Sequence, residues 1–565
     1  MRRLIPASAW IKGYNRDIFY SDGIAALIVA IMLVPQSLAY ALLAGLPPEV
    51  GLYASIFPLI MYALLGTSST LSVGPVAITS LLTASALSEV AAAGSTDYLA
   101  AAITLAALSG LMLTLGGIFR LGFLSNFLSH SVVSAFITAS AILIVLSQLR
   151  HVFGIESHGE SITELIGSLY ASLSDYSLDT LLMAVGVIAF LYICKEYLAV
   201  MLMKAGLTRK TSGLASRAAP VLAIIASITL VVVFGLDTRG VAVVGDIPSG
   251  LPAFGLPVFS MALVEPLLVP AFMISIIGYV ESISVGKTLG NKRRERIDSN
   301  QELIGLGAAN LASAFSGGLP VTGGFSRSVV NFDAGAVTQA ASIYTAVLIG
   351  IFSLLFTPML YFLPKATLAA TIIVAVLSLV DFSIIRKTFL ISRSDCMAVV
   401  TTIVLTLYLG VGAGVTSGVL ISLLLHVYRT SRPHIAAVGL VEGTEHFRNV
   451  KRYRVKTCPR ILTLRLDESL FFANAIRLEE LILKRLYQHD EIGHVILMCT
   501  AINEVDYSAM ETLESINHNL NEQGVMLHLS EVKGPVMDIL QKSDFLEALG
   551  GHVYLTQYQA YHDLC

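Results

Sequence analysis

The chain has 565 residues, of which 55% are hydrophobic and only 13% are charged. Its mean hydropathy of +0.76 lies far outside the range of soluble globular proteins and predicts a polytopic membrane protein. A formal net charge of -3 leaves no basic surplus for nucleic acid. The scattered cysteines have neither metal-ligand nor disulfide spacing, and the chain has no GxxxxGK[ST] loop. We therefore expect no metal, no cofactor, no ATP-driven transport and no enzyme.

A basic stretch, residues 1–20, precedes the first apolar run and is expected to be cytoplasmic. Apolar runs long enough to cross the hydrocarbon core then recur as far as about residue 428. Clear examples are residues 22–43, 100–115, 181–199, 220–234, 264–285 and 343–360. With shorter, broken segments they predict about 14 membrane segments, in a transport domain of residues 21–431.

Two of the apolar segments are short and interrupted by Gly and Pro. They are residues 72–79 and 319–332, and they fall at corresponding places in the two halves of the chain. Matched interrupted segments indicate the binding site of an inverted-repeat transporter. We therefore place the candidate site where these two segments meet.

Positive charges fix the expected orientation. Three loops are rich in Lys and Arg, whereas the loops on the other side are poor in them, as in residues 151–178. The basic loops contain Lys204, Arg209, Lys210 and Arg217, then Lys287, Lys292, Arg293, Arg294 and Arg296, then Arg386, Lys387 and Arg393. The positive-inside rule places these loops in the cytoplasm. An even number of segments places both termini there too. We expect the protein in the inner or plasma membrane of the cell.

Arg327 lies in the second broken segment and needs an explanation. An Arg at bilayer depth costs roughly 2.5 to 3.5 kcal/mol on insertion scales, so it usually faces a polar cavity, a partner charge or an anion. Gly324, Ser326 and Ser328 surround it at the expected start of a short helix, where N–H groups and the helix dipole favour an anion. Pro75 suits the start of a second such helix. The alternative is that Arg327 only pairs with a buried carboxylate to hold the fold.

Glu281 is the candidate carboxylate, in an apolar segment that ends at a basic loop. Burial and a nearby cation act in opposite directions on the proton affinity of a carboxyl group, so such a Glu can be poised to exchange a proton. A purely structural ion pair with Arg327 is the alternative. Lys195 and Glu196, near the cytoplasmic end of another segment, are interpreted as a snorkelling pair without a functional role.

After residue 431 the charge rises and the apolar runs shorten, which predicts a soluble cytoplasmic domain, residues 432–565. Expected strands are residues 460–466, 494–499, 525–529 and 552–556, and expected helices are residues 473–487, 508–521 and 535–549. Alternation of strands and helices indicates a small α/β domain. Ser508 opens a helix where a phosphate would meet backbone N–H groups. Capping of that helix by Asp506 or Ser508 is the favoured alternative.

Three sequence runs resemble the sulfate permease family, also called solute carrier family 26. They are VPQSLAYALLAGLPPEVGLYAS at residues 34–55, ESISVGK at residues 281–287 and GFSRSVVNF at residues 324–332. The C-terminal region is similar to a STAS domain (sulfate transporter and anti-sigma factor antagonist). The resemblance therefore covers nearly the whole chain.

The resemblance implies two inverted seven-helix repeats that form a core and a gate, an elevator-like movement and a homodimer. It places the substrate between the facing starts of the third and tenth helices. The residues it implies for substrate binding are Gln36, Tyr40, Val76, Ala77, Phe325, Ser326, Arg327 and Ser328. The residue it implies for proton coupling is Glu281.

The chain departs from the family pattern at two places. Sodium-coupled bicarbonate members carry an Asp one turn after the Glu of the eighth helix, where this chain has Val285, and this weakens a sodium site. Soluble STAS antagonists carry Asp-Ser-Ser-Gly, whereas residues 506–509 read DYSA. The second departure argues against phosphorylation of Ser508.

Together these features predict proton-coupled secondary active transport of an inorganic or small organic anion, with sulfate as the leading substrate. Bicarbonate and C4-dicarboxylate symport remain open, because the same donors bind all of these anions. An anion channel or exchanger is a further alternative, as is a sensor with the STAS domain as output. A cytoplasmic protein partner of the STAS domain is also expected.

Overall fold

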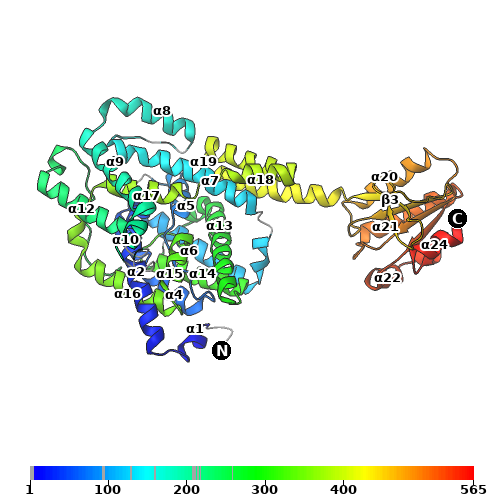
Figure 1. Ribbon diagram of the computed structural model, residues 1–565, viewed down its shortest axis with the longest axis horizontal. Coiled ribbons are helices and arrows are strands. Elements are labelled where there is room, and N and C mark those ends of the chain that lie inside the picture. The colour runs from blue at the N-terminus through cyan, green and yellow to red at the C-terminus, as the bar shows by residue number, and fades with distance from the viewer. Residues whose placement is uncertain are drawn as a thin grey trace. The chain divides into compact units, whose positions relative to one another are not determined.

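The computed structural model describes residues 6–91, 96–126, 130–157, 159, 161–206, 212, 216, 218–257 and 259–565. It divides into two compact units, Met1–Ser422 and Leu423–Cys565. In Figure 1 the first unit runs from blue to yellow and is almost entirely helical, whereas the second, in orange and red, contains a sheet. The predicted boundary at Ser431 coincides with the last residue of α19.

The first unit is built from apolar helices. Its first half contains α1 (Ala7–Ile11), α2 (Arg16–Leu43), α3 (Pro48–Tyr53), α4 (Phe57–Leu65), α5 (Ala77–Ser88), α6 (Thr96–Ile118), α7 (His130–Phe153), α8 (Ile162–Ser172), α9 (Leu178–Ile193), α10 (Ala199–Lys204) and α12 (Ala219–Phe234). Its second half contains α13 (Met261–Arg293), α14 (Ser299–Phe315), α15 (Phe325–Ala334), α16 (Ala340–Leu355), α17 (Lys365–Leu377), α18 (Ser383–Ile391) and α19 (Arg393–Ser431).

These helices agree with the predicted number of membrane segments. Within the described residues, 7 helices or helix pairs are long and apolar enough to cross a membrane, and shorter apolar helices include α5, α12, α16 and α17. Non-helical dihedral angles at Gly410 divide α19 in two. With α14 and α15 added, the chain forms two successions of seven segments, and the predicted apolar runs all coincide with helices. The basic residues Arg209, Lys210 and Arg217 lie outside the described residues.

A buried carboxylate fixes the loop that leads into the first broken segment. Glu302 on α14 is fully buried. It accepts hydrogen bonds from the Tyr62 hydroxyl at 2.8 Å and from the backbone N–H groups of Thr67 at 2.7 Å and Ser68 at 3.2 Å. The Thr67 hydroxyl donates a further bond at 2.6 Å. Because a buried charge without such donors would cost several kcal/mol, on the order of the effective penalty per ion, this network holds the loop to α14.

The second unit contains one sheet and the predicted alternation of strands and helices. Its strands are β3 (Ile435–Leu440), β4 (Phe447–Asn449), β5 (Ile461–Leu466), β6 (His494–Met498), β7 (Met526–Ser530) and β8 (Val553–Tyr554), in the order β4-β3-β5-β6-β7-β8. Strands β5 to β8 are parallel, and β3 is antiparallel to both neighbours. Its helices are α20 (Ala475–Leu486), α21 (Tyr507–Glu522), α22 (Gly534–Leu540), α23 (Phe545–Ala548) and α24 (Gln557–Leu564).

Two details of the second unit differ from the prediction. Strands β3 and β4 were not expected, and the helix predicted at residues 535–549 is wrong because the structure has α22 and α23 there. Between them the Ser543 hydroxyl donates to the Leu540 carbonyl at 3.0 Å and accepts from the Phe545 N–H at 3.4 Å. A Ser side chain that bonds nearby backbone competes with the helix in this way.

Three histidines lie beside one another across the parallel strands. His528 on β7 is buried, and its Nδ1 accepts the His552 backbone N–H at 3.0 Å. Its Nε2 lies 3.1 Å from Nδ1 of His494, so the neutral ring satisfies both of its nitrogens. Burial lowers the pKa of His528 to about 4, and the neighbouring His494 and His552 act in the same direction.

This cluster predicts acid sensitivity of the second unit. The unfolded chain binds a proton on this histidine below about pH 6.5, whereas the folded His528 stays neutral down to a pKa of about 4. The free energy of unfolding should therefore be fully present above pH 6.5 and fall progressively as the pH drops towards 4. Thermal unfolding of residues 432–565 as a function of pH measures this slope.

The variant His528→Asn keeps an acceptor for the His552 N–H and removes the titration, so its stability should fall less steeply with acid. The exposed His489 offers a matched control, and His489→Gln should behave like the parent. An unchanged slope in His528→Asn would show that other groups cause the acid sensitivity.

Candidate anion-binding site

The two broken segments meet in a short antiparallel crossing. Strand β1 (Val73–Gly74) pairs with β2 (Thr322–Gly323), in the register Val73 to Gly323 and Gly74 to Thr322. Helix α5 begins just after β1 and α15 just after β2, and neither start has a side-chain cap. The first N–H groups of a helix have no partner inside it. Two helix starts with such groups are thus brought to one place.

Arg327 connects the two halves of this crossing. It lies in the first turn of α15 and is only 2% exposed. Its Nη1 donates to the Pro75 carbonyl at 2.9 Å and its Nη2 to the Thr322 carbonyl at 3.5 Å. Among the described residues no ion pair joins Arg327 to Glu281 or to another carboxylate. The guanidinium is therefore held by neutral carbonyls, and its charge is left for a ligand.

Two glycines make room for this guanidinium. A Cβ atom on Gly74 would lie 2.9 Å from Arg327 Nη1, and one on Gly324 would lie 2.9 Å from both Nε and Nη2. Real Cβ atoms do not approach other atoms so closely. A side chain at either position would displace the guanidinium, because the backbone of each half touches the same cation.

A cavity of about 480 Å³ lies at the crossing and collects most of the predicted site residues. Those that line it are Gln36, Tyr40, Val76, Ala77, Glu281, Phe325, Ser326 and Arg327. Ser328 is not among the lining residues. Its hydroxyl donates to the Gly324 carbonyl at 2.7 Å and accepts the Ser72 N–H at 3.0 Å. Ser328 thus ties α15 to the segment before β1.

Glu281 reaches the cavity from α13, which is fastened to β2 by the next residue. The Ser282 hydroxyl lies 2.8 Å from that of Thr322 and accepts the Gly323 N–H at 2.8 Å. Oε2 of Glu281 is buried without a hydrogen-bond partner. A carboxyl oxygen in that position either carries a proton or awaits a donor, because a bare buried charge is costly.

Lys195, interpreted from the sequence as a snorkelling interfacial residue, is exposed and also lines this cavity. It lies in η3 (Cys194–Leu198), a π-helical turn between α9 and α10. The Ser216 hydroxyl donates to the Cys194 carbonyl at 2.7 Å and so supports this turn. Single π-helical turns inside α-helices are frequent at functional sites. In the sequence, Lys195 stands out as a lysine inside an apolar span. Hydropathy alone does not predict towards which part of the structure its side chain points.

The cavity extends towards the side of the basic loops. Beyond the crossing its lining continues to Ser216, ahead of α12, and to Ser378 and Leu379, which follow α17. These positions lie next in sequence to the Lys- and Arg-rich loops at Lys204 and Arg386. An anion could therefore approach Arg327 from that side, past Lys195.

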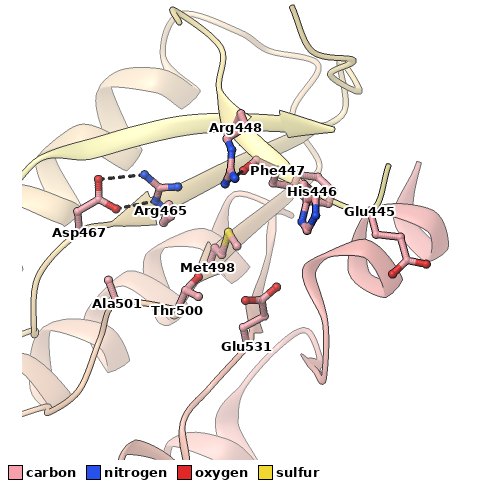
Figure 2. A pocket seen from close by; sticks show the side chains of 10 residues that line it. All are labelled: Glu445, His446, Phe447, Arg448, Arg465, Asp467, Met498, Thr500, Ala501 and Glu531. Carbon is pink, nitrogen blue, oxygen red and sulfur yellow. Dashed lines mark hydrogen bonds and ion pairs between the residues drawn. The ribbon is translucent and has the colours of Figure 1, made fainter. Parts of the chain in front are cut away.

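The second unit has a cavity of its own, of about 390 Å³, at the ends of strands β5 to β7 (Figure 2). Arg448, Arg465, Asp467 and Glu531 bring both signs of charge to it. Nε and Nη2 of Arg465 donate to the two Asp467 oxygens at 2.6 and 3.1 Å. Hydrogen bonding to Asp467 raises the pKa of Arg465. This arginine is engaged within the unit, so the mixed cavity is not an evident anion site.

Ser508 lies apart from this cavity, exposed in the first turn of α21. The carboxylate of Asp506 accepts the Ala509 N–H at 2.8 Å and caps the helix. The favoured alternative, capping by Asp506, is confirmed. In the described part of the chain, no group of three or more His, Cys, Asp or Glu side chains could hold a metal ion.

Comparison with known proteins places this geometry among transporters. The Sulfate permease family matches residues 19–402 and the STAS domain matches residues 452–560. The chain is 34% identical to Sulfate transporter 4.1, chloroplastic, of Arabidopsis thaliana over 560 residues, 97% of this chain and 80% of that protein. It is 33% identical to a probable sulfate transporter of Mycobacterium tuberculosis over 555 residues, 98% of this chain and 96% of that protein.

Two solved structures share the fold. The murine Solute Carrier 26 family member A9 anion transporter in the inward-facing state has a TM-score of 0.90 and 25% identity, covering 99% of this chain and 93% of that one. The transmembrane domain of the cyanobacterium bicarbonate transporter BicA has a TM-score of 0.61 and 22% identity, covering 72% of this chain and 98% of that one. The predicted fold class, a helical membrane region followed by a STAS domain, is confirmed.

Gly74 gives a direct test of the site. Gly74→Ala should push the guanidinium of Arg327 away from the Pro75 carbonyl, because the far end of an Arg side chain moves more easily than packed backbone. Anion affinity of the purified protein should fall roughly tenfold, about 1.4 kcal/mol, in an equilibrium titration. Gly186→Ala is the control, since a Cβ there meets nothing within 4 Å. Equal affinities in both variants would contradict the placement of the site.

Proposed function

The chain belongs to the sulfate permease family, and on that premise we propose that it is a secondary active transporter whose substrate is sulfate. The family consists of anion transporters rather than enzymes, and several relatives are named sulfate transporters. The observation that carries the proposal is the buried Arg327 without a carboxylate partner among the described residues, in a cavity between two uncapped helix starts. Such a centre favours an anion.

The bound oxyanion lies between the starts of α5 and α15. Backbone N–H groups near Ala77 and Phe325 point partial positive charges at it, and Arg327 supplies the full charge. Gln36, Tyr40 and Ser326 line the same cavity and offer neutral donors from α2 and α15. A tetrahedral dianion with several acceptor oxygens can use donors from both halves at once. Closure of the halves around it is then favoured only when the anion is present.

Proton coupling follows from the charge of Glu281. An ionised Glu281 in the cavity that holds a dianion adds like-charge repulsion, which protonation removes. A proton and the anion therefore bind more tightly together than apart, and this positive coupling is reciprocal. Proton-coupled uptake needs that linkage. Val285, one turn later, supplies no oxygen ligand for sodium.

The cavity supports an inward-facing state and an elevator-like cycle. Its lining reaches Ser378 on the side of the basic loops, which we place in the cytoplasm with both termini. On the other side, Leu43, Leu368 and Ile372 belong to one buried apolar cluster, which we propose closes the path. If the helices that carry the anion site moved past the helices that carry this apolar cluster, the site would open to the opposite side of the membrane. We further propose that the protein is a homodimer in the plasma or inner membrane. Each chain has a cytoplasmic N-terminal segment, residues 1–20, a transport domain, residues 21–431, and a cytoplasmic STAS domain, residues 432–565. The STAS domain would bind a cytoplasmic protein partner.

Liposome transport tests the site. Purified protein should take up labelled sulfate against its gradient when the pH is stepped, and Arg327→Ala should lose most of this uptake and of sulfate binding because no other described cation takes its place at the crossing. Arg239→Ala, at an exposed residue, should match the parent. Bicarbonate and fumarate offered in parallel decide the substrate class. Normal sulfate transport by correctly inserted Arg327→Ala would overturn the site.

Glu281→Gln tests the coupling separately. The amide mimics the protonated carboxyl, so sulfate should still bind and equilibrate while uphill uptake driven by a pH gradient is lost. Glu265→Gln, an exposed change on the same helix α13, serves as the control. Uphill, pH-driven uptake that survives in Glu281→Gln would remove this residue from the coupling mechanism.

A further inference from the structure

A second, smaller cavity lies on the side away from the basic loops. It measures about 280 Å³. It is bounded by the end of α2 at Gly45, the last turn of α7 with Arg150 and His151, and the first turn of α17 with Lys365. Its lining includes these three basic side chains and no carboxylate. Like charges that share a partly buried space repel one another, so this arrangement needs a compensating group.

The two fixed charges are not neutralised within the described part of the chain. Arg150 Nε donates to His151 Nε2 at 3.3 Å, which makes that ring nitrogen an acceptor and the imidazole neutral. Arg150 Nη1 donates to the Ser157 carbonyl at 3.3 Å, again a neutral group. No hydrogen bond or ion pair is formed by the Lys365 ammonium in that part of the chain.

The start of α17 adds to the positive potential of this cavity. Helix α17 has 13 residues and its first residue, Lys365, lines the cavity together with Leu368. Its N-cap residue, Pro364, makes no side-chain cap hydrogen bond, and the first backbone N–H of the helix, that of Lys365, donates to the Ala242 carbonyl at 2.9 Å. The positive end of the helix dipole therefore acts in the same direction as the two cationic side chains.

The small cavity and the central one lie at successive levels along the same two helices. On α2, Tyr40 lines the central cavity and Leu42 the smaller one. On α17, Thr371 lines the central cavity and Leu368 the smaller one. One buried apolar cluster contributes to the walls of both cavities, with Tyr40 in the central one and Leu368 and Ile372 in the smaller one. An anion held in the small cavity would lie close to the path to Arg327.

We propose that this cavity is a second anion site, a vestibule in which the Arg150 and Lys365 side chains, supported by the dipole of α17, bind a small oxyanion before it reaches the central cavity. The proposal rests on the proposed function for the identity of the anion. The vestibule would raise the local anion concentration at the entrance, as clefts lined by one sign of charge do. Since its charges are partly exposed, salt should weaken it.

Uptake measurements from the vestibule side provide the first test. Lys365→Gln removes a charge whose ammonium makes no hydrogen bond to any described residue, so the fold should be kept. At low ionic strength the half-saturating sulfate concentration for uptake should rise several-fold with an unchanged maximal rate, and the difference should shrink in high salt. Lys365→Arg should restore the parent value. Lys287→Gln, an exposed change near the opposite end of the membrane unit, is the control.

An unchanged half-saturation in Lys365→Gln at low salt would overturn the vestibule. So would an equal rise in Lys287→Gln, or a failure of Lys365→Arg to restore the parent value.

Equilibrium binding keeps this proposal apart from the central site. In an Arg327→Ala background, sulfate titrated into purified protein should show a weaker residual binding event, and the additional change Lys365→Gln should abolish it. Absence of the residual event, or its persistence in the double variant, overturns the vestibule. If Arg327→Ala instead binds sulfate as tightly as the parent, the central site is wrong, and the loss or persistence of binding on adding Lys365→Gln still decides the vestibule.

Discussion

The membrane unit depends on one guanidinium held between two backbone segments that are about 250 residues apart in sequence. Arg327 donates to the Pro75 carbonyl of one half and to the Thr322 carbonyl of its own half, across the pairing of β1 with β2. Neutral carbonyls orient the cation without cancelling its charge. Both backbones touch the guanidinium, so a side chain on Gly74 or Gly324 would displace it. Fold and site therefore share one interaction.

The remaining polar groups follow from that cation. Ser328 and Ser282 use their hydroxyls to fix the segments around it, which leaves the cavity-facing donors free for a ligand. Glu281 adds the only carboxylate among the described residues that line the central cavity, and Lys195 adds a second positive charge nearer the basic loops. In the proposed mechanism, one fixed cation, one protonatable acid and two uncapped helix starts link the anion to a proton. They do not by themselves choose between sulfate and other anions of similar size and charge.

Much of the fold could be predicted from local features of the sequence. Apolar runs of membrane length, the Gly- and Pro-interrupted segments and the period of the C-terminal strands need no tertiary information, and the helices and β5 to β8 coincide with them. What failed depended on tertiary contacts. The short strand β4 owes its existence to pairing with β3, and the break at Ser543 to a local side-chain bond. The Ser328 hydroxyl is oriented by a bond to the distant Ser72 N–H. The π-helical turn that carries Lys195 is supported by Ser216, which is also distant in sequence.

Localisation of the bound anion is the most direct test of the central claim. A structure of the protein determined with selenate, an electron-dense analogue of sulfate, would show where the anion sits. The account predicts density within hydrogen-bonding distance of the Arg327 guanidinium and of the first backbone N–H groups of α5 and α15. Density that occupies another part of the cavity, with the crossing empty at saturating selenate, would contradict it.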